Sequence, residues 1–179
     1  MLKITVPATE QYDESTSTFI YSKEQVLQLE HSLVSISKWE SRWRKPFLSK
    51  DSKTIQETID YIRCMTITQN VDDAVYNNLS NDNIQAINTY IEAEMTATTF
   101  SKEKQGNSRE VVTAELIYYW MVTMNIPFEC QKWHLNRLLT LINVINIKNS
   151  PPKKMSTREI MSRNTELNEA RLKTLANGG

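Results

Sequence analysis

The chain has 179 residues, which is enough for one domain with a core, or for one domain followed by a tail. Hydrophobic residues make up 40% of it and charged residues 23%, which is typical of a soluble globular protein rather than a disordered one. The formal net charge is zero, so no global field favours nucleic acid or a membrane surface. Only three glycines occur, two of them at the very end, which excludes Gly-rich phosphate loops and dinucleotide-binding motifs.

The two cysteines and the N-terminal segment point to a compartment. Cys64 and Cys130 are too few for a disulfide framework and lack CxxC spacing, which favours reduced thiols in a cytosol. The opening MLKITVPATE has no long apolar segment, and no run approaches the roughly 18 apolar residues of a membrane span. We therefore expect a soluble, intracellular protein that does not contact a membrane.

The first 30 residues are rich in β-forming side chains. The segments 2-LKITV-6, 18-TFIYS-22 and 26-VLQLE-30 are short and bounded by polar stretches, and the first alternates apolar with polar residues. This pattern predicts a small hairpin or sheet of two or three strands.

From Ser32 the apolar residues follow a helical period. Amphipathic helices are predicted over 32–43, which stops near Pro46, and over 52–66, where Thr54 and Glu57 have capping-box spacing. Two shorter helices are expected over 71–79 and 80–93, the second capped by Ser80 or Asn81. Residues 94–108 have no period and predict an exposed loop.

Two further helices are predicted after this loop. Residues 109–124 are apolar around most of the helix circumference, which favours a central core helix, and the Asn-Ile-Pro of 125–127 ends it. A second helix is expected over 129–146 with a broad apolar face. The core is expected to join side chains from both helices, namely Ile117, Trp120, Trp133, Leu138 and Ile142.

Pro151 and Pro152 separate this domain from the C-terminal segment. From Lys148 onward there are seven Lys or Arg residues against three Glu. The fold class is therefore mainly α (α+β): a small N-terminal β-hairpin or sheet, then a helical bundle, then a basic helical tail. The predicted domains are a globular 1–150, β-rich over 1–30 and helical over 31–150, and a tail over 151–179 whose partner lies outside the domain.

Several groups could carry chemistry. Cys130 and His134 are four residues apart, which on one helix would allow a zinc site completed by Cys64 and His31, or a Cys–His nucleophile pair. Helix packing explains the same residues more simply, because catalytic Cys and His seldom lie on one turn. We expect no catalytic, metal-binding or cofactor-binding residue, and no enzyme.

Two charged clusters have similarly plain interpretations. Asp72 and Asp73 point to different faces of a helix, so they favour a helix start rather than a metal site. The basic residues of 42–53 alternate with Trp43 and Phe47, which could bind nucleic acid. A solvated rim over two core aromatic residues is the simpler interpretation, so a nucleic-acid partner is not expected.

Six blocks of the sequence carry a likeness to known proteins: 29-LEHSLVSISKWESRWRKPFLSK-50, 57-ETIDYIRCMTITQNV-71, 95-MTATTF-100, 115-ELIYYWMVTMNIPFECQKWHLNRLLTLI-142, 151-PPKKMS-156 and the terminal RNTELNEARLKTLANGG. Together they resemble a family of tailed-bacteriophage proteins that is similar to proteins encoded among tail genes. The likeness covers nearly the whole chain. It implies a helical tail assembly chaperone that keeps the tape-measure protein soluble while tail-tube subunits polymerise, with no catalytic motif.

The function expected is therefore bacteriophage tail morphogenesis in the host cytoplasm. The main hypothesis is a chaperone that binds the tape-measure or tail-tube protein, and a homo-oligomer is left open. The alternative is a structural virion component, such as a neck, tail-completion or minor tail protein. The expected partner-binding residues form a thin apolar stripe on the basic tail, with its arginines: Arg158, Met161, Arg163, Leu167, Arg171, Leu172 and Leu175.

Overall fold

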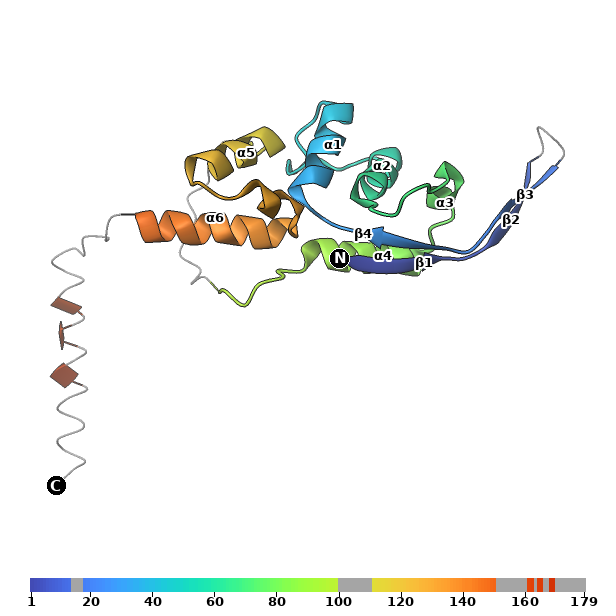
Figure 1. The fold of residues 1–179 in the computed structure, drawn as a ribbon. Coiled ribbons are helices and arrows are strands. Elements are labelled where there is room, and N and C mark those ends of the chain that lie inside the picture. The colour runs from blue at the N-terminus through green and yellow to red at the C-terminus, as the bar shows by residue number, and fades with distance from the viewer. Residues whose placement is uncertain (14–17, 100–110, 151–160, 163, 166–167, 170–179) are drawn as a thin grey trace, which may run out of the picture. The chain divides into compact units, whose positions relative to one another are not determined.

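The computed structural model describes residues 1–13, 18–99, 111–150, 161–162, 164–165 and 168–169. Strands come first in the described chain and helices follow, which confirms the predicted α+β class (Figure 1). The elements are β1 (Leu2–Val6), β2 (Thr9–Asp13), β3 (Thr18–Ser22), β4 (Gln25–Leu29), α1 (Leu33–Trp43), α2 (Ile55–Met65), α3 (Asp73–Asn77), α4 (Asn81–Glu92), α5 (Ala114–Thr123), the 3-10 helix η1 (Phe128–Lys132) and α6 (Leu135–Asn149).

The four strands form two antiparallel pairs that share one register. β1 pairs with β4 from Leu2 opposite Leu29, and β2 pairs with β3 from Thr9 opposite Ser22. The register is continuous, so the two pairs are one long hairpin interrupted after β1, where Pro7 has no N–H to donate. The sequence analysis missed β2 because its residues are mostly polar, and a strand held by ladder hydrogen bonds carries no apolar signature.

Local side-chain hydrogen bonds set the starts of the helices. In α2, Thr54 Oγ1 accepts from Glu57 N at 3.2 Å while Glu57 Oε2 accepts from Thr54 N at 2.7 Å, which confirms the predicted capping box. Ser80 Oγ accepts from Asn83 N at 3.2 Å at the start of α4, as expected. Ser32 and Ser35 form a second capping box at the start of α1.

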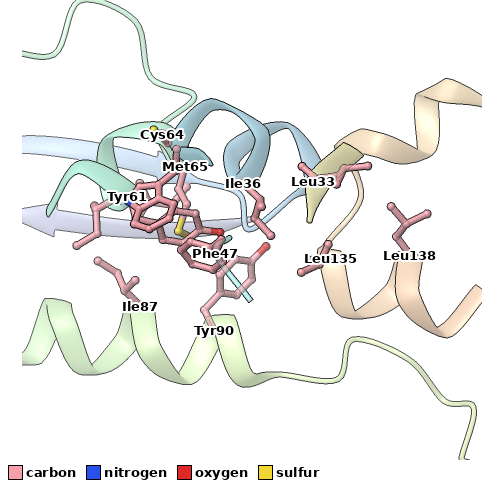
Figure 2. Close-up of a cluster of buried hydrophobic side chains, with 14 of the residues drawn as sticks. Leu33, Ile36, Phe47, Tyr61, Cys64, Met65, Ile87, Tyr90, Leu135 and Leu138 are labelled. Carbon is pink, nitrogen blue, oxygen red and sulfur yellow. The ribbon is translucent and has the colours of Figure 1, made fainter. Parts of the chain in front are cut away.

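The core gathers apolar side chains from β1, β4, helices α1 to α6 and η1. Figure 2 shows Leu33 and Ile36 of α1, Met65 of α2, Ile87 of α4 and Leu135 of α6 among them. Each of these five side chains is at most 2% exposed. The junction between hairpin and helices is closed by backbone bonds from Glu30 N to Met65 O and from Ile67 N to Gln28 O.

The predicted single helix over 129–146 is wrong. The chain instead forms η1, breaks at Trp133–His134, and begins α6 at Leu135. At the break, Leu135 N donates to His31 O at 2.8 Å, and His134 forms an antiparallel bridge with Ser32. Backbone groups from a distant segment thus replace helical hydrogen bonds, which no local pattern reveals.

The apolar composition of 109–124 predicts a helix at the centre of the core. Helix α5 instead lies at the edge of the core. Ala114, Ile117 and Met121 are buried, while residues on the opposite face are open to solvent. Of the five expected core side chains, Ile117, Leu138 and Ile142 are buried, but Trp120 and Trp133 are only partly buried against the core. The reason is that one side of α5 has no neighbouring element among the described residues.

A buried carboxylate fixes the start of α5. Glu40 on α1 is 7% exposed. Its Oε2 accepts from Ala114 N at 2.8 Å, and its Oε1 accepts from Phe47 N at 2.7 Å. Negative charge at a helix N-terminus is favourable, so Glu40 joins α1, the following loop and α5.

The chain divides into two compact units, Met1–Ile145 and Asn146–Gly179. The division into 1–150 and 151–179 made from the sequence stays a prediction. None of the helices in the described residues is both long and apolar enough to cross a membrane.

Candidate functional site

The predicted partner-binding stripe falls largely outside the described residues. Met161 is helical and 65% exposed, and its carbonyl accepts from Thr165 Oγ1 at 2.9 Å. The other residues of the stripe lie outside the described part of the chain, so their role stays a prediction: Arg158, Arg163, Leu167, Arg171, Leu172 and Leu175.

The two histidines of the chain meet in the core, which the sequence did not indicate. The rings of His31 and His134 lie 5.1 Å apart, centroid to centroid, in an edge-on arrangement. Cys130 lies on η1 and His134 follows it, so the pair expected on one helix face is not on one helix. Among the described residues, no group of three or more His, Cys, Asp or Glu side chains is placed to hold a metal ion.

His31 lies just before α1 and is hydrogen-bonded in the core to Tyr61 of α2, which also contacts Ser35 of α1. Its side chain is 3% exposed, and its Nδ1 lies 2.5 Å from Tyr61 Oη, which in turn lies 3.3 Å from Ser35 Oγ. Burial, with a smaller contribution from His134, lowers the pKa of His31 from 6.5 to about 4. Burial likewise raises the pKa of the Tyr61 hydroxyl. Both rings are therefore neutral near pH 7.

His134 is held from the opposite side by α4. Its Nε2 lies 2.9 Å from Tyr90 O, and its Nδ1 accepts from Asn136 N at 3.3 Å. Burial lowers the pKa of His134, against the opposing effects of the Tyr90 carbonyl and Glu30. Tyr90 Oη donates to Glu30 Oε1 at 2.6 Å, and the other oxygen of Glu30 pairs with the Met1 ammonium at 3.0 Å. These hydrogen bonds join α4, α6 and the N-terminus around two neutral imidazoles, which is a structural role.

Both cysteines are buried in the core. Cys64 and Cys130 are free thiols, 6% and 5% exposed. Burial, and then the Asp60 carboxylate, raise the pKa of Cys64, which keeps it in the thiol form. Packing is thus the role that the geometry supports for Cys64.

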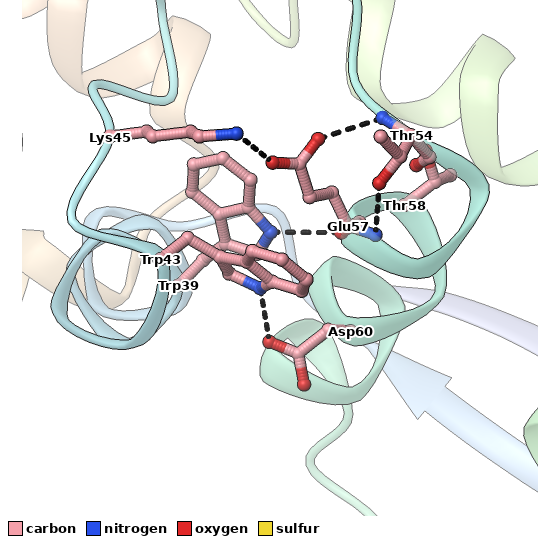
Figure 3. Close-up of polar contacts among 7 residues, drawn as sticks. All are labelled: Trp39, Trp43, Lys45, Thr54, Glu57, Thr58 and Asp60. Carbon is pink, nitrogen blue, oxygen red and sulfur yellow. Dashed lines mark hydrogen bonds and ion pairs between the residues drawn. The ribbon is translucent and has the colours of Figure 1, made fainter.

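Two basic residues of the segment 42–53 form ion pairs with α2, and Figure 3 shows the one between Lys45 and Glu57. Arg42 pairs with Asp60 at 2.6 Å, and Lys45 pairs with the buried carboxylate of Glu57 at 2.6 Å. The ammonium of Lys53 lies 4.3 Å from the centroid of the Phe47 ring. A phosphate that bound Arg42 or Lys45 would compete with these carboxylates. That nucleic acid is not a partner stays a prediction.

The acidic pair at 72–73 starts a helix, as expected. Asp72 Oδ1 accepts from Ala74 N at 3.0 Å and caps α3. Asp73, in the first turn, lies 3.4 Å from Arg63 Nε.

A surface that the sequence analysis did not identify lies on α5 and η1. Tyr119, Val122 and Phe128 are 61%, 59% and 54% exposed, and Tyr118 lies beside them with its ring centroid 6.5 Å from that of Phe128. We call Tyr118, Tyr119, Val122 and Phe128 the aromatic face. Its signal in the sequence is the apolar character of most of the helix circumference, which by itself favours a central core helix as much as an exposed binding face.

Comparison of the chain with protein-family models, with curated proteins and with solved structures finds no match.

Proposed function

We propose that the chain is a non-enzymatic protein of bacteriophage tail morphogenesis, a tail assembly chaperone that binds the tape-measure protein in the host cytoplasm. The observation that carries the proposal is the aromatic face. The resemblance to proteins encoded among phage tail genes supplies the identity of the partner.

The aromatic face has the composition of a binding surface. Aromatic side chains are enriched in the centres of protein interfaces, where they dominate the binding energy. Val122 follows Tyr119 by three residues and Tyr118 by four, which places it next to both on α5, and the Phe128 ring of η1 lies 6.5 Å from that of Tyr118. Lys132 and Glu129 are exposed nearby on η1 and provide charged groups at its rim.

The expected partner suits such a surface. A tape-measure protein is a long helical chain with apolar stripes, which would aggregate before the tail tube encloses it. An amphipathic helix binds by placing its apolar stripe on an apolar face of the receptor, without a cofactor. The aromatic face could therefore bind one apolar stripe of a tape-measure helix reversibly.

The test is copurification of the tape-measure protein with the full chain from infected cells. The double variant Tyr119→Ser with Val122→Ser should lose most of the tape-measure protein. Ile55→Ser is the matched control, because Ile55 is 80% exposed and lies on α2, outside the aromatic face. Equal recovery with both variants would show that the aromatic face does not bind this partner.

Mass spectrometry of purified particles separates the two candidate roles. A chaperone leaves the particle, so the chain should be absent from mature virions. A structural neck, tail-completion or minor tail protein would instead be present at a fixed number of copies, with the aromatic face buried in a permanent interface.

A further inference from the structure

A groove runs along α4 on a part of the molecule that the aromatic face does not include. Helix α4 lies alongside β1 (Figure 1) and buries only Ile87 and Tyr90. Its open side forms a groove of about 560 Å³ with Leu2 of β1 at one wall and Met95 beyond the helix. The groove is thus formed by segments far apart in the sequence.

The groove is shallow, and mostly short side chains of α4 form its floor. Ala86, Thr89 and Ala93 line it at helical spacing, and their short side chains allow another backbone to approach closely. Met95 has a left-handed backbone, with φ of 50°, and its side chain is 45% exposed. A left-handed conformation is unfavourable for a residue that carries a Cβ, so the turn that presents this apolar side chain is held against a local penalty.

The charged side chains of α4 and of the segment that follows it, to residue 99, are all acidic. Residues 64–99 contain five acidic side chains and no lysine or arginine, although the whole chain is neutral. Asp82 lines the groove, and Glu92 and Glu94 are exposed near Met95. The Met1 ammonium is occupied by Glu30 at 3.0 Å. A ligand with apolar groups flanked by positive charge would complement this surface, whereas a phosphate backbone would be repelled.

We infer that the α4 groove is a docking site for a basic amphipathic helix of a partner protein. Helix α4 has 12 residues, so it is about 18 Å long and matches roughly three turns of a docked helix. The apolar stripe of that helix lies over Ala86 and Ala93, and its Lys or Arg residues face Asp82 and Glu92. The inference does not rest on the proposed function, since it concerns different residues.

Two synthetic helical peptides of one apolar pattern test the groove, one with Lys and one with Glu at the flanking positions. Each is labelled and titrated with the full chain, and binding is followed by fluorescence anisotropy. The Lys peptide should bind at least about tenfold more tightly than the Glu peptide, and added salt should weaken its binding.

Two matched variants locate the site. Ala86→Arg places a long cation in the groove and should weaken binding of the Lys peptide at least about tenfold. Asn88→Arg adds the same side chain at an exposed position of α4 that does not line the groove, and should change the affinity by less than about threefold. Circular dichroism confirms that both variants fold.

Three results would overturn the inference. Equal affinity for both peptides would show that the groove does not select a basic helix. Equal loss of affinity in Ala86→Arg and Asn88→Arg would show that the Lys peptide binds by non-specific charge attraction and not in the groove. If the chain alone forms oligomers that Ala86→Arg dissociates, a second copy occupies the groove instead. The peptide experiments do not depend on whether the aromatic face binds the tape-measure protein. The proposed function and this inference can therefore be refuted independently of each other.

Discussion

Acid should destabilise the protein through its buried histidine pair, and replacing His31 by Gln should remove much of this effect. The His31 ring is 3% exposed, and its neighbours at close range among the described residues are the rings of Tyr61, Phe47 and His134. A proton on this ring would be buried without a counter-charge. The unfolded chain takes up that proton readily, whereas the folded chain resists it, so acid favours unfolding.

The magnitude follows from the pKa of His31, which falls from 6.5 to about 4 on folding. Because the folded pKa is the lower one, the stabilisation is fully present above pH 6.5 and is lost as the pH falls toward about 4. Within this window a single histidine changes the free energy of unfolding by up to about 1.4 kcal/mol per pH unit. Between about pH 7.5 and about pH 5 the loss from His31 is therefore about 2 kcal/mol. His134 contributes with the same sign, since burial lowers its pKa as well.

Urea unfolding followed by tryptophan fluorescence measures this loss, with the free energy extrapolated to water at each pH. In His31→Gln, an amide can still hydrogen-bond Tyr61 but cannot titrate, so its stability should fall about 2 kcal/mol less than that of the unaltered chain between about pH 7.5 and about pH 5. The chain has only two histidines. The double variant with His134→Gln therefore measures the part of the stability loss in acid that does not come from histidine. If His31→Gln and the unaltered chain lose stability in parallel, the assignment of a depressed pKa to His31 is wrong.

Three further predictions use the same urea titration at about pH 7.5. Glu40→Gln should lower the free energy of unfolding by about 1.5–3 kcal/mol. The reason is that the amide nitrogen of Gln would face one of the two backbone N–H groups that now donate to the carboxylate. A loss below about 0.5 kcal/mol would contradict this role. Thr54→Ala should cost about 1 kcal/mol through loss of the α2 capping box, and Thr54→Ser should restore most of it. Deleting 151–179 should leave a cooperative transition with little change in midpoint, because a lone helix of that length is marginal in water; a chain that fails to fold would show that the tail belongs to the core.

The sequence by itself determined the local structure wherever the cause was local. The starts of α2 and α4 follow from Thr54, Glu57 and Ser80, since a capping side chain bonds a backbone N–H only two or three residues away. Strand β1 follows from its alternation of side chains. The helical class follows from the period of apolar residues after Ser32, because each such stripe must be buried.

Tertiary structure decided every feature that joins distant segments. His31 and His134 meet because the chain returns after η1 and pairs His134 with Ser32, a backbone contact between segments about 100 residues apart that leaves no local pattern. The same contact splits the helix expected over 129–146.

The two candidate surfaces depend on the tertiary structure for a related reason. An all-apolar helix such as α5 carries the same residues whether its second side is covered or open, and only its neighbours determine which. The α4 groove likewise exists because Leu2 of β1 lies against a helix some 80 residues later, and composition alone revealed only that the segment around it is acidic.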